Sequence, residues 1–404
     1  MQKIIGALAA LFLILVSSVH GEEIYLKSES LIEFKSNLNN QPEVPFNQYV
    51  TLDLRNKSID FITDFGAFGD PYGEQSDFHL YATSLAFKKI GNVFDIKAGR
   101  FNLTDAFNVN TIDGGEIGIH FNDYLTFRSY IGAQRFIEES DFVEGNFITG
   151  AILSLENYKN NSLAFKFEYE DALYANDYFM RVGTSFHHYF DILTAPEIYS
   201  NVEVEASYGT LQELTAGFRF YPGVFVWDSS FSYVDTEATI ESKEWNILRI
   251  TAVSPMYAFN QELRINPHEV ISLFTAYEFS TYEYDVGVTS YGNSIESGFD
   301  LHDHYFSKMV TASGFYKSSF GGEFYGARLI PEIHLFKILT LRSYIELVQF
   351  TKITNEEGIA YTQDLSSTIK ITERVSFNIK GEYNSNDELN NDVRGYLGLI
   401  YEYF

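Results

Sequence analysis

The stretch Leu163–Glu170 reads Leu-Ala-Phe-Lys-Phe-Glu-Tyr-Glu, with large apolar side chains at the odd positions and mostly charged ones at the even positions. Successive side chains of a β-strand point to opposite faces, so a period of two predicts a strand with one apolar and one wet face. The same alternation runs through residues 125–133, 339–347 and 374–383. After the N-terminal segment, apolar residues do not recur at the i, i+3, i+4 spacing of a helix. The chain is therefore predicted to be all-β.

Short polar turns separate the predicted strands in pairs. These turns divide the chain from residue 24 onward into ten intervals, most of roughly 30–36 residues, the length of two strands and a longer loop. Ten hairpins give about 20 strands, but Arg55–Ser58 has short flanking runs, and without it the number is about 18, in a range of roughly 16–20. The turns are predicted at Arg55–Ser58, Lys89–Asn92, Asn122–Asp123, Asn157–Asn161, His187–Tyr189, Tyr221–Gly223, Asn266–His268, Phe336–Lys337 and Thr372–Glu373.

Acidic segments rich in Gly and Asn alternate with the short turns. This asymmetry is typical of a transmembrane antiparallel up-and-down β-barrel with short periplasmic turns and long extracellular loops. A soluble sandwich or propeller would also alternate, but no motif recurs at fixed offsets and no helices are available to cover so continuous an apolar face. Lipid is then the natural partner, and a closed barrel is the β-structure that spans it. The predicted loops are 138–145, 235–244, 282–303, 354–358 and 384–392.

The interval from Pro267 to Phe336 is about twice as long as the others, although a hairpin needs only two strands. We expect part of 284–322 to fold into the barrel as a constriction that faces Arg249, Arg264 and Arg328. An outward loop or taller strands are the alternatives.

The N-terminus has the pattern of a secretory signal. A positive start at Met1–Lys3 precedes an almost wholly apolar run over residues 4–16, and small residues follow up to Gly21. The run is too short to cross a bilayer, which takes about 20 residues. We therefore expect a signal peptide over residues 1–21 and a single outer-membrane barrel domain over residues 22–404.

The composition excludes several functional classes. A formal net charge of -27 argues against nucleic acid as a partner, because phosphates must be neutralised by Lys and Arg. The absence of Cys excludes disulfides and thiolate metal sites. Disordered chains have few aromatic and many charged residues, whereas this chain has 17 % aromatic and 21 % charged residues.

The last predicted strand ends at the C-terminus of the chain. Gly398, Tyr401, Tyr403 and the terminal Phe404 resemble the C-terminal assembly signal of bacterial outer-membrane β-barrels, although Phe404 shares the parity of Gly398 rather than that of the two tyrosines. By pattern, the whole mature chain resembles a porin-type barrel.

The stretch from Ile96-Lys97-Ala98-Gly99-Arg100 through Asp113-Gly114-Gly115 loosely resembles a Gly-Arg…Asp-Gly stretch of alginate-export and related substrate-specific porins. The porin resemblance as a whole implies the bacterial outer membrane as location. It also implies lipid, lipopolysaccharide and the barrel-assembly machinery as partners, and leaves a homo-oligomer open.

Charged residues of both signs fall on the parity that would face the lumen. They would line a pore and orient hydrated solutes, or pair with one another in a plugged barrel; the large number of strands favours the pore. The pore-lining candidates are Arg128, Arg181, Arg219, Arg249, Arg264, Arg328, Arg342, Arg374, Glu346 and Asp364.

No enzymatic motif stands out. His302-Asp303-His304 could share a cation, but spacing fixes no third ligand, and a hydrated loop end is the favoured interpretation. We therefore predict no catalytic residues, no metal and no cofactor. The predicted function is passive diffusion of small hydrophilic solutes, with a barrel hydrolase at the outer rim or a surface structural or adhesion barrel as alternatives.

Overall fold

The computed structural model describes the chain from Glu23 to Tyr403 with gaps. The residues described are 23–36, 42–69, 76–104, 109–135, 146–172, 177–191, 196–235, 256–285, 288–303, 308–319, 322–336, 338–352, 357–386 and 392–403. The predicted signal peptide over residues 1–21 and the terminal Phe404 lie outside these ranges. Among the residues covered, no helix is long and apolar enough to cross a membrane.

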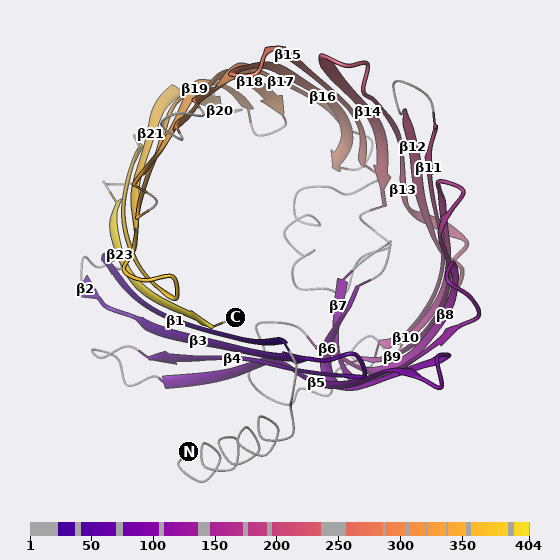
Figure 1. The fold of residues 1–404 in the computed structure, drawn as a ribbon. Helices are drawn as coiled ribbons and strands as arrows, with labels where there is room; N and C mark the ends of the chain where they lie inside the picture. Colours follow the sequence, from indigo (N-terminus) through magenta and orange to yellow (C-terminus); the bar gives the residue numbers. More distant parts are fainter. Residues whose placement is uncertain are drawn as a thin grey trace.

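The described chain forms one antiparallel sheet in which each long strand pairs with its neighbours in sequence (Figure 1). The strands are β1 (Glu23–Ser36), β2 (Pro42–Glu43), β3 (Phe46–Arg55), β4 (Ile59–Gly69), β5 (Ser76–Ile90), β6 (Phe94–Thr104), β7 (Val109–His120), β8 (Leu125–Arg135), β9 (Phe147–Tyr158), β10 (Asn161–Ala172), β11 (Asp177–Tyr189), β12 (Glu197–Glu205), β13 (Thr210–Phe220), β14 (Phe225–Val234), β15 (Met256–His268), β16 (Ile271–Asp285), β17 (Val288–Asp303), β18 (Lys308–Ser319), β19 (Gly322–Leu335), β20 (Leu339–Lys352), β21 (Glu357–Lys370), β22 (Val375–Asn386) and β23 (Asp392–Tyr403).

The sheet closes into a barrel because the first strand pairs with the last. β1 meets β23 from Leu26 opposite Tyr403 to Phe34 opposite Gly395, so no long edge is left at this seam. Gly398 and Tyr401, from the predicted assembly signal, lie within this closing strand. The all-β antiparallel barrel predicted from the sequence is confirmed.

The described residues form 22 long strands; the two-residue β2 directly precedes β3 and pairs with the end of β1. The prediction of about 18 strands, with an upper limit of 20, is therefore wrong. Two hairpins account for the difference. The turn after Arg55 is real, since β3 ends there and β4 begins at Ile59. The interval from 267 to 336 contains one hairpin more than predicted, with β16 to β19 following one another through it.

The predicted constriction over 284–322 is wrong for the same reason. Residues 288–303 and 308–319 are the wall strands β17 and β18, each paired with both neighbours. The alternation in β17 is carried by Tyr291, Ile295, Phe299 and Leu301, with Gly, Ser and Asn between them. Because small polar residues interrupt the apolar alternation, the sequence pattern of this segment is typical of a loop.

The connections are less asymmetric than predicted. Seven of the nine predicted tight turns overlap a strand connection at one end of the barrel, and those at 187–189 and 266–268 directly precede one. At the other end, residues 136–146 and 235–255 join strands over long stretches, but β16–β17 and β18–β19 are joined by residues 286–287 and 320–321 alone.

The two faces of the wall differ in chemistry. Large apolar side chains on one parity are exposed around the barrel, for example Ile117 at 51 %, Ile131 at 55 % and Leu365 at 57 %. Exposed apolar surface of this extent on a closed barrel is the lipid-facing belt of an outer-membrane protein.

Candidate functional site

The charged parity lies on the inner, concave face of the wall. Several of its ion pairs and hydrogen bonds bridge an intervening strand: Arg264 of β15 reaches Asp300 of β17, and Arg328 of β19 reaches Glu296 of β17. Neighbouring strands are about 4.8 Å apart, so such pairs span about 10 Å of sheet. Side chains on a concave face converge and can meet in this way.

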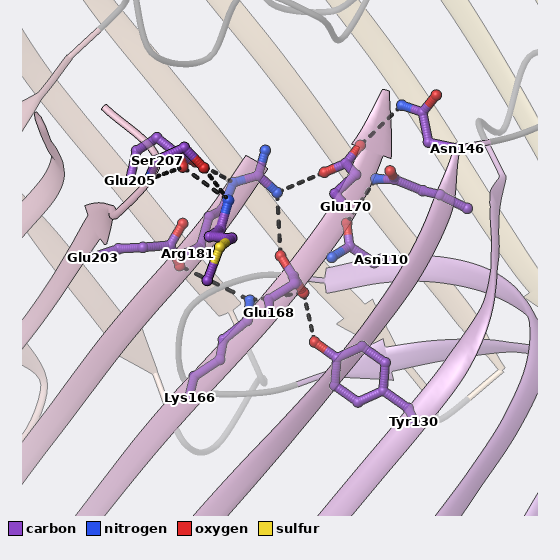
Figure 2. Close-up of polar contacts among 12 residues, drawn as sticks. Asn110, Tyr130, Asn146, Lys166, Glu168, Glu170, Arg181, Glu203, Glu205 and Ser207 are labelled. Carbon is purple, nitrogen blue, oxygen red and sulfur yellow. Dashed lines mark hydrogen bonds and ion pairs between the residues drawn. The ribbon is translucent and has the colours of Figure 1, made fainter. Parts of the chain in front are cut away.

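A buried charge network occupies the inner face of β8 to β12 (Figure 2). Lys166 and Glu168, two residues apart on β10, have fully buried side chains and form an ion pair of 3.2 Å between Nζ and Oε2. The hydroxyl of Tyr130 donates a 2.5 Å hydrogen bond to Glu168, and Glu203 lies 3.9 Å from Lys166. Charges this deeply buried are tolerated only when paired, and the register places these partners on adjacent rows.

Arg181 is the second cation of this network and lies among three carboxylates. Its Nη1 donates to Glu168 at 3.1 Å and to Glu170 at 2.7 Å, and its Nε lies 3.9 Å from Oε2 of Glu205. Nε of Arg181 and Oε2 of Glu205 are both buried, and neither atom makes a hydrogen bond within the described part of the chain. With four carboxylates around two cations, this part of the wall carries more negative than positive charge.

A second, more exposed ladder of ion pairs follows the inner face of β15 to β23. Arg264 binds Asp300 at 2.6 Å, Arg328 binds Glu346 at 2.7 Å, and the Lys380 amino group lies 3.3 Å from Asp364. The three cationic side chains are 37 %, 30 % and 39 % exposed, whereas Lys166 is fully buried. The two halves of the inner wall therefore differ in their access to solvent.

The hairpin of β6 and β7 explains this difference. β6 pairs with β5 only from Phe94 to Arg100, although both strands continue further, while β6 and β7 remain paired up to Thr104. Figure 1 shows the start of β7 leaving the ring of strands and pointing into the space that the ring encloses. The end of this hairpin is folded over the inner face of the barrel.

Glycines allow the sharp bend. Gly99 has a φ of +122°, and a Cβ there would lie 2.2 Å from the carbonyl oxygen of Thr83. Gly114, opposite Gly99, and Gly132, opposite Gly114, are equally tight: a Cβ would lie 2.1 Å from the oxygen of Ile131 and 2.7 Å from that of Asp113. A row of three glycines across β6, β7 and β8 thus forms the hinge line.

Beyond the hinge, the hairpin packs against the wall through an apolar cluster. Phe101, Leu103 and Ile112 of the hairpin are at most 2 % exposed, and so are the wall residues of the same cluster, Tyr130, Ile148 and Ile152. Tyr130 links this cluster to the charge network through Glu168. The inward-folded hairpin therefore covers the β8–β10 wall and excludes water from it.

Arg100 and Asp113 form a clamp on the other face of the hairpin. The Nε and Nη2 atoms of Arg100 donate to the two carboxylate oxygens of Asp113 at 2.6 and 2.8 Å, a bidentate geometry. Nη1 of Arg100 also donates to the carbonyl oxygen of Leu80 at 2.6 Å, on the part of β5 that β6 no longer pairs with. Both residues belong to the stretch that resembles substrate-specific porins, but their role at a hinge is visible only in three dimensions.

The predicted pore-lining residues are spread over both halves of the wall. Arg374 is in the turn after β21, with its guanidinium 4.5 Å from the ring centre of Tyr403, and Arg249 lies outside the described residues. Arg342 stays largely exposed, 3.9 Å from Glu332. The others are strand residues on the inner face: Arg128 of β8, Arg181 of β11, Arg219 of β13, Arg264, Arg328, Glu346 of β20 and Asp364 of β21.

No group of three or more potential ligands for a metal ion occurs in the described ranges. His302 is the last residue but one of β17, opposite Met309, and His304 lies outside those ranges. The predictions of no metal, no cofactor and no catalytic residue remain predictions.

No protein-family model and no curated protein sequence matches this chain. Among solved structures, the translocation pore of the P pilus usher PapC is similar, with a TM-score of 0.53 and 8 % identity over 94 % of this chain and 99 % of that one. A BenF-like porin from Pseudomonas fluorescens Pf-5 has a TM-score of 0.48 at 9 % identity, covering 95 % and 99 %. OpdK from Pseudomonas aeruginosa has 0.41 at 8 %, covering 94 % and 98 %.

Identities this low show a likeness of fold alone. The fold shared with the PapC pore is a closed antiparallel β-barrel, as predicted from the sequence.

Proposed function

We propose that the protein is an outer-membrane channel through which small hydrophilic solutes diffuse passively, without a cofactor and without turnover. The observation that carries the proposal is the inner face: a closed barrel with an apolar exterior has charged and polar side chains along its inner wall. A barrel of more than about 16 strands is too wide for wall side chains alone to fill.

The inward-folded hairpin of β6 and β7 determines which part of the inner wall the solutes contact. It covers the wall from β8 to β10, so the solute path runs along the opposite half, past Arg264, Arg328 and Lys380. The hairpin thus takes the place of the inward loop that constricts many porins.

The channel favours cations and neutral solutes over anions. Arg264, Arg328 and Lys380 each have a carboxylate within 3.3 Å, which cancels most of their attraction for anions. The overall charge of -27 adds a negative background.

Reconstitution of the folded protein into planar lipid bilayers tests the proposal. We expect stepwise conductance with a reversal potential shifted toward that of the cation in a salt gradient. Correctly folded protein that never conducts would overturn the proposal. It would favour the two rivals, a hydrolase at the outer rim and a surface structural or adhesion barrel, neither of which needs a conducting lumen.

The proposed partners follow from the surface. Outer-membrane lipid and lipopolysaccharide would contact the apolar belt, and the barrel-assembly machinery would recognise the C-terminal strand with Gly398, Tyr401, Tyr403 and Phe404. We do not expect nucleic acid as a partner, because a net charge of -27 would repel its phosphates. Light scattering of the detergent-solubilised protein distinguishes a monomer from the homo-oligomer that the porin resemblance leaves open.

A further inference from the structure

One area of the inner wall is rich in aromatic rings. Tyr49 of β3, Gly66 of β4 and His79 of β5 lie side by side in one row of the sheet. Phe68 follows Gly66 on the same face of β4. Tyr81 is the extra residue of a β-bulge, because Asp64 pairs with Ala82 and Phe65 already pairs with Leu80. A bulge re-aims a side chain, and here it brings a fourth ring to the same face.

The four rings pack against one another, and Phe68 meets Tyr49 and His79 edge-on, at interplanar angles of 82° and 71°. A Cβ at Gly66 would lie 3.0 Å from ring atoms of both Phe68 and Tyr81, so these two rings occupy the space that the missing side chain leaves. Tyr81 is nearly parallel to Tyr49, at 25° and 6.4 Å between ring centres, and to His79, at 22° and 6.1 Å. The result is a cluster of three near-parallel rings and one edge-on ring, called here the aromatic platform, formed by Tyr49, Phe68, His79 and Tyr81.

A carboxylate borders this platform. Asp64 precedes Gly66 on the inner face of β4, and one of its oxygens accepts a 3.1 Å hydrogen bond from the hydroxyl of Thr51. The other charge in contact with the platform is also negative: Asp77 lies 3.4 Å from Nε2 of His79. Lys27, two strands from Asp64 in the same row, is paired with Glu29 at 3.0 Å, which cancels most of its attraction for an acidic solute. The platform therefore combines aromatic rings with hydrogen-bond acceptors.

We propose that the aromatic platform is a docking site for the rings of neutral sugars, a proposal that rests on the channel function above. One face of a pyranose ring presents C–H groups, which pack on aromatic rings, and its hydroxyl groups donate hydrogen bonds to carboxylates such as Asp64. Aromatic docking with few charges gives weak, rapidly reversible binding, which suits a channel because a solute must also leave.

The test is block of single-channel current by maltohexaose, a neutral linear glucose oligomer. We expect wild-type protein to show transient, concentration-dependent block. Tyr81→Ala should raise the half-blocking concentration about tenfold, which corresponds to about 1.4 kcal/mol, within the range of one aromatic contact. Tyr396→Ala, which removes an inner-face ring near Lys380, is the matched control and should leave the block unchanged.

Two further variants separate docking from folding. Tyr81→Phe keeps the ring and should retain most of the block, whereas Asp64→Asn keeps the shape and should weaken it. A conducting wild type that maltohexaose does not block, or equal block in Tyr81→Ala and wild type, would overturn the platform as a sugar site and leave the channel proposal intact. A folded wild type that does not conduct would overturn the channel proposal instead.

Discussion

Ile112→Ala should release the inward-folded hairpin and widen the channel. Ile112 is fully buried between the hairpin and the wall, in the cluster with Phe101 and Ile148. Truncation of a buried Ile to Ala costs about 2–5 kcal/mol. Because the wall beneath the hairpin is paired on both sides, we expect this cost to fall mainly on the docking of the hairpin. At about 1.4 kcal/mol for each factor of ten, the ratio of undocked to docked hairpin should rise at least about 25-fold.

Single-channel recording measures this effect as a larger mean conductance or as frequent excursions to a higher level. Ile117→Ala is the matched control, since it makes the same truncation on the same strand at a side chain that is 51 % exposed on the lipid face. Heat-modifiable gel migration should show that both variants are folded. If folded Ile112→Ala conducts like wild type, without added noise, the hairpin does not narrow the channel.

Three other substitutions test the wall itself. Lys166→Ala should lower the free energy of unfolding by about 3–5 kcal/mol in urea titrations, because it leaves buried carboxylates without their cation, whereas Lys380→Ala, at a part-exposed pair, should cost about 1 kcal/mol or less; equal losses would contradict the burial of the network. Gly114→Ala should prevent formation of the heat-modifiable barrel, because its Cβ would meet a backbone oxygen at 2.1 Å, while Gly381→Ala, with open space around it, should fold normally. Arg328→Gln should shift the reversal potential further toward the cation by freeing two carboxylates, and an unchanged selectivity would place the ion path elsewhere.

The barrel could be predicted from the sequence because its physical signal is local. Alternation of apolar and polar residues, as in Leu163–Glu170, follows directly from the geometry of a strand between lipid and water. The strand count was harder, because it depends on every turn being recognised. β17 carries Gly, Ser and Asn at many positions, and only four large residues keep the alternation, so the pattern predicts a loop where the structure has a strand of a hairpin.

The inward-folded hairpin could not be predicted in the same way. In β6 and β7 the apolar side chains change parity at the hinge: Phe94, Ile96 and Ile117 are exposed on the lipid face, whereas beyond Gly99 and Gly114 the buried apolar residues lie on the other parity. The alternation of apolar and polar residues along a strand does not indicate in which direction the sheet bends. The usable signal was the concentration of glycine at residues 99, 114, 115, 118 and 132, together with a buried Ile and Phe on the parity expected to be wet.

The most direct test of the central claim is the chemical modification of two neighbouring residues on opposite faces of β20. The chain has no Cys, so Glu346→Cys and Leu347→Cys each provide a single reactive thiol, the first on the inner wall and the second 52 % exposed on the apolar exterior. A charged methanethiosulfonate reagent should change the single-channel current of the variant at 346 and leave that of the variant at 347 unchanged. If the thiol at 346 reacts and the current stays the same, ions do not pass along this wall and the account of the protein as a channel is wrong.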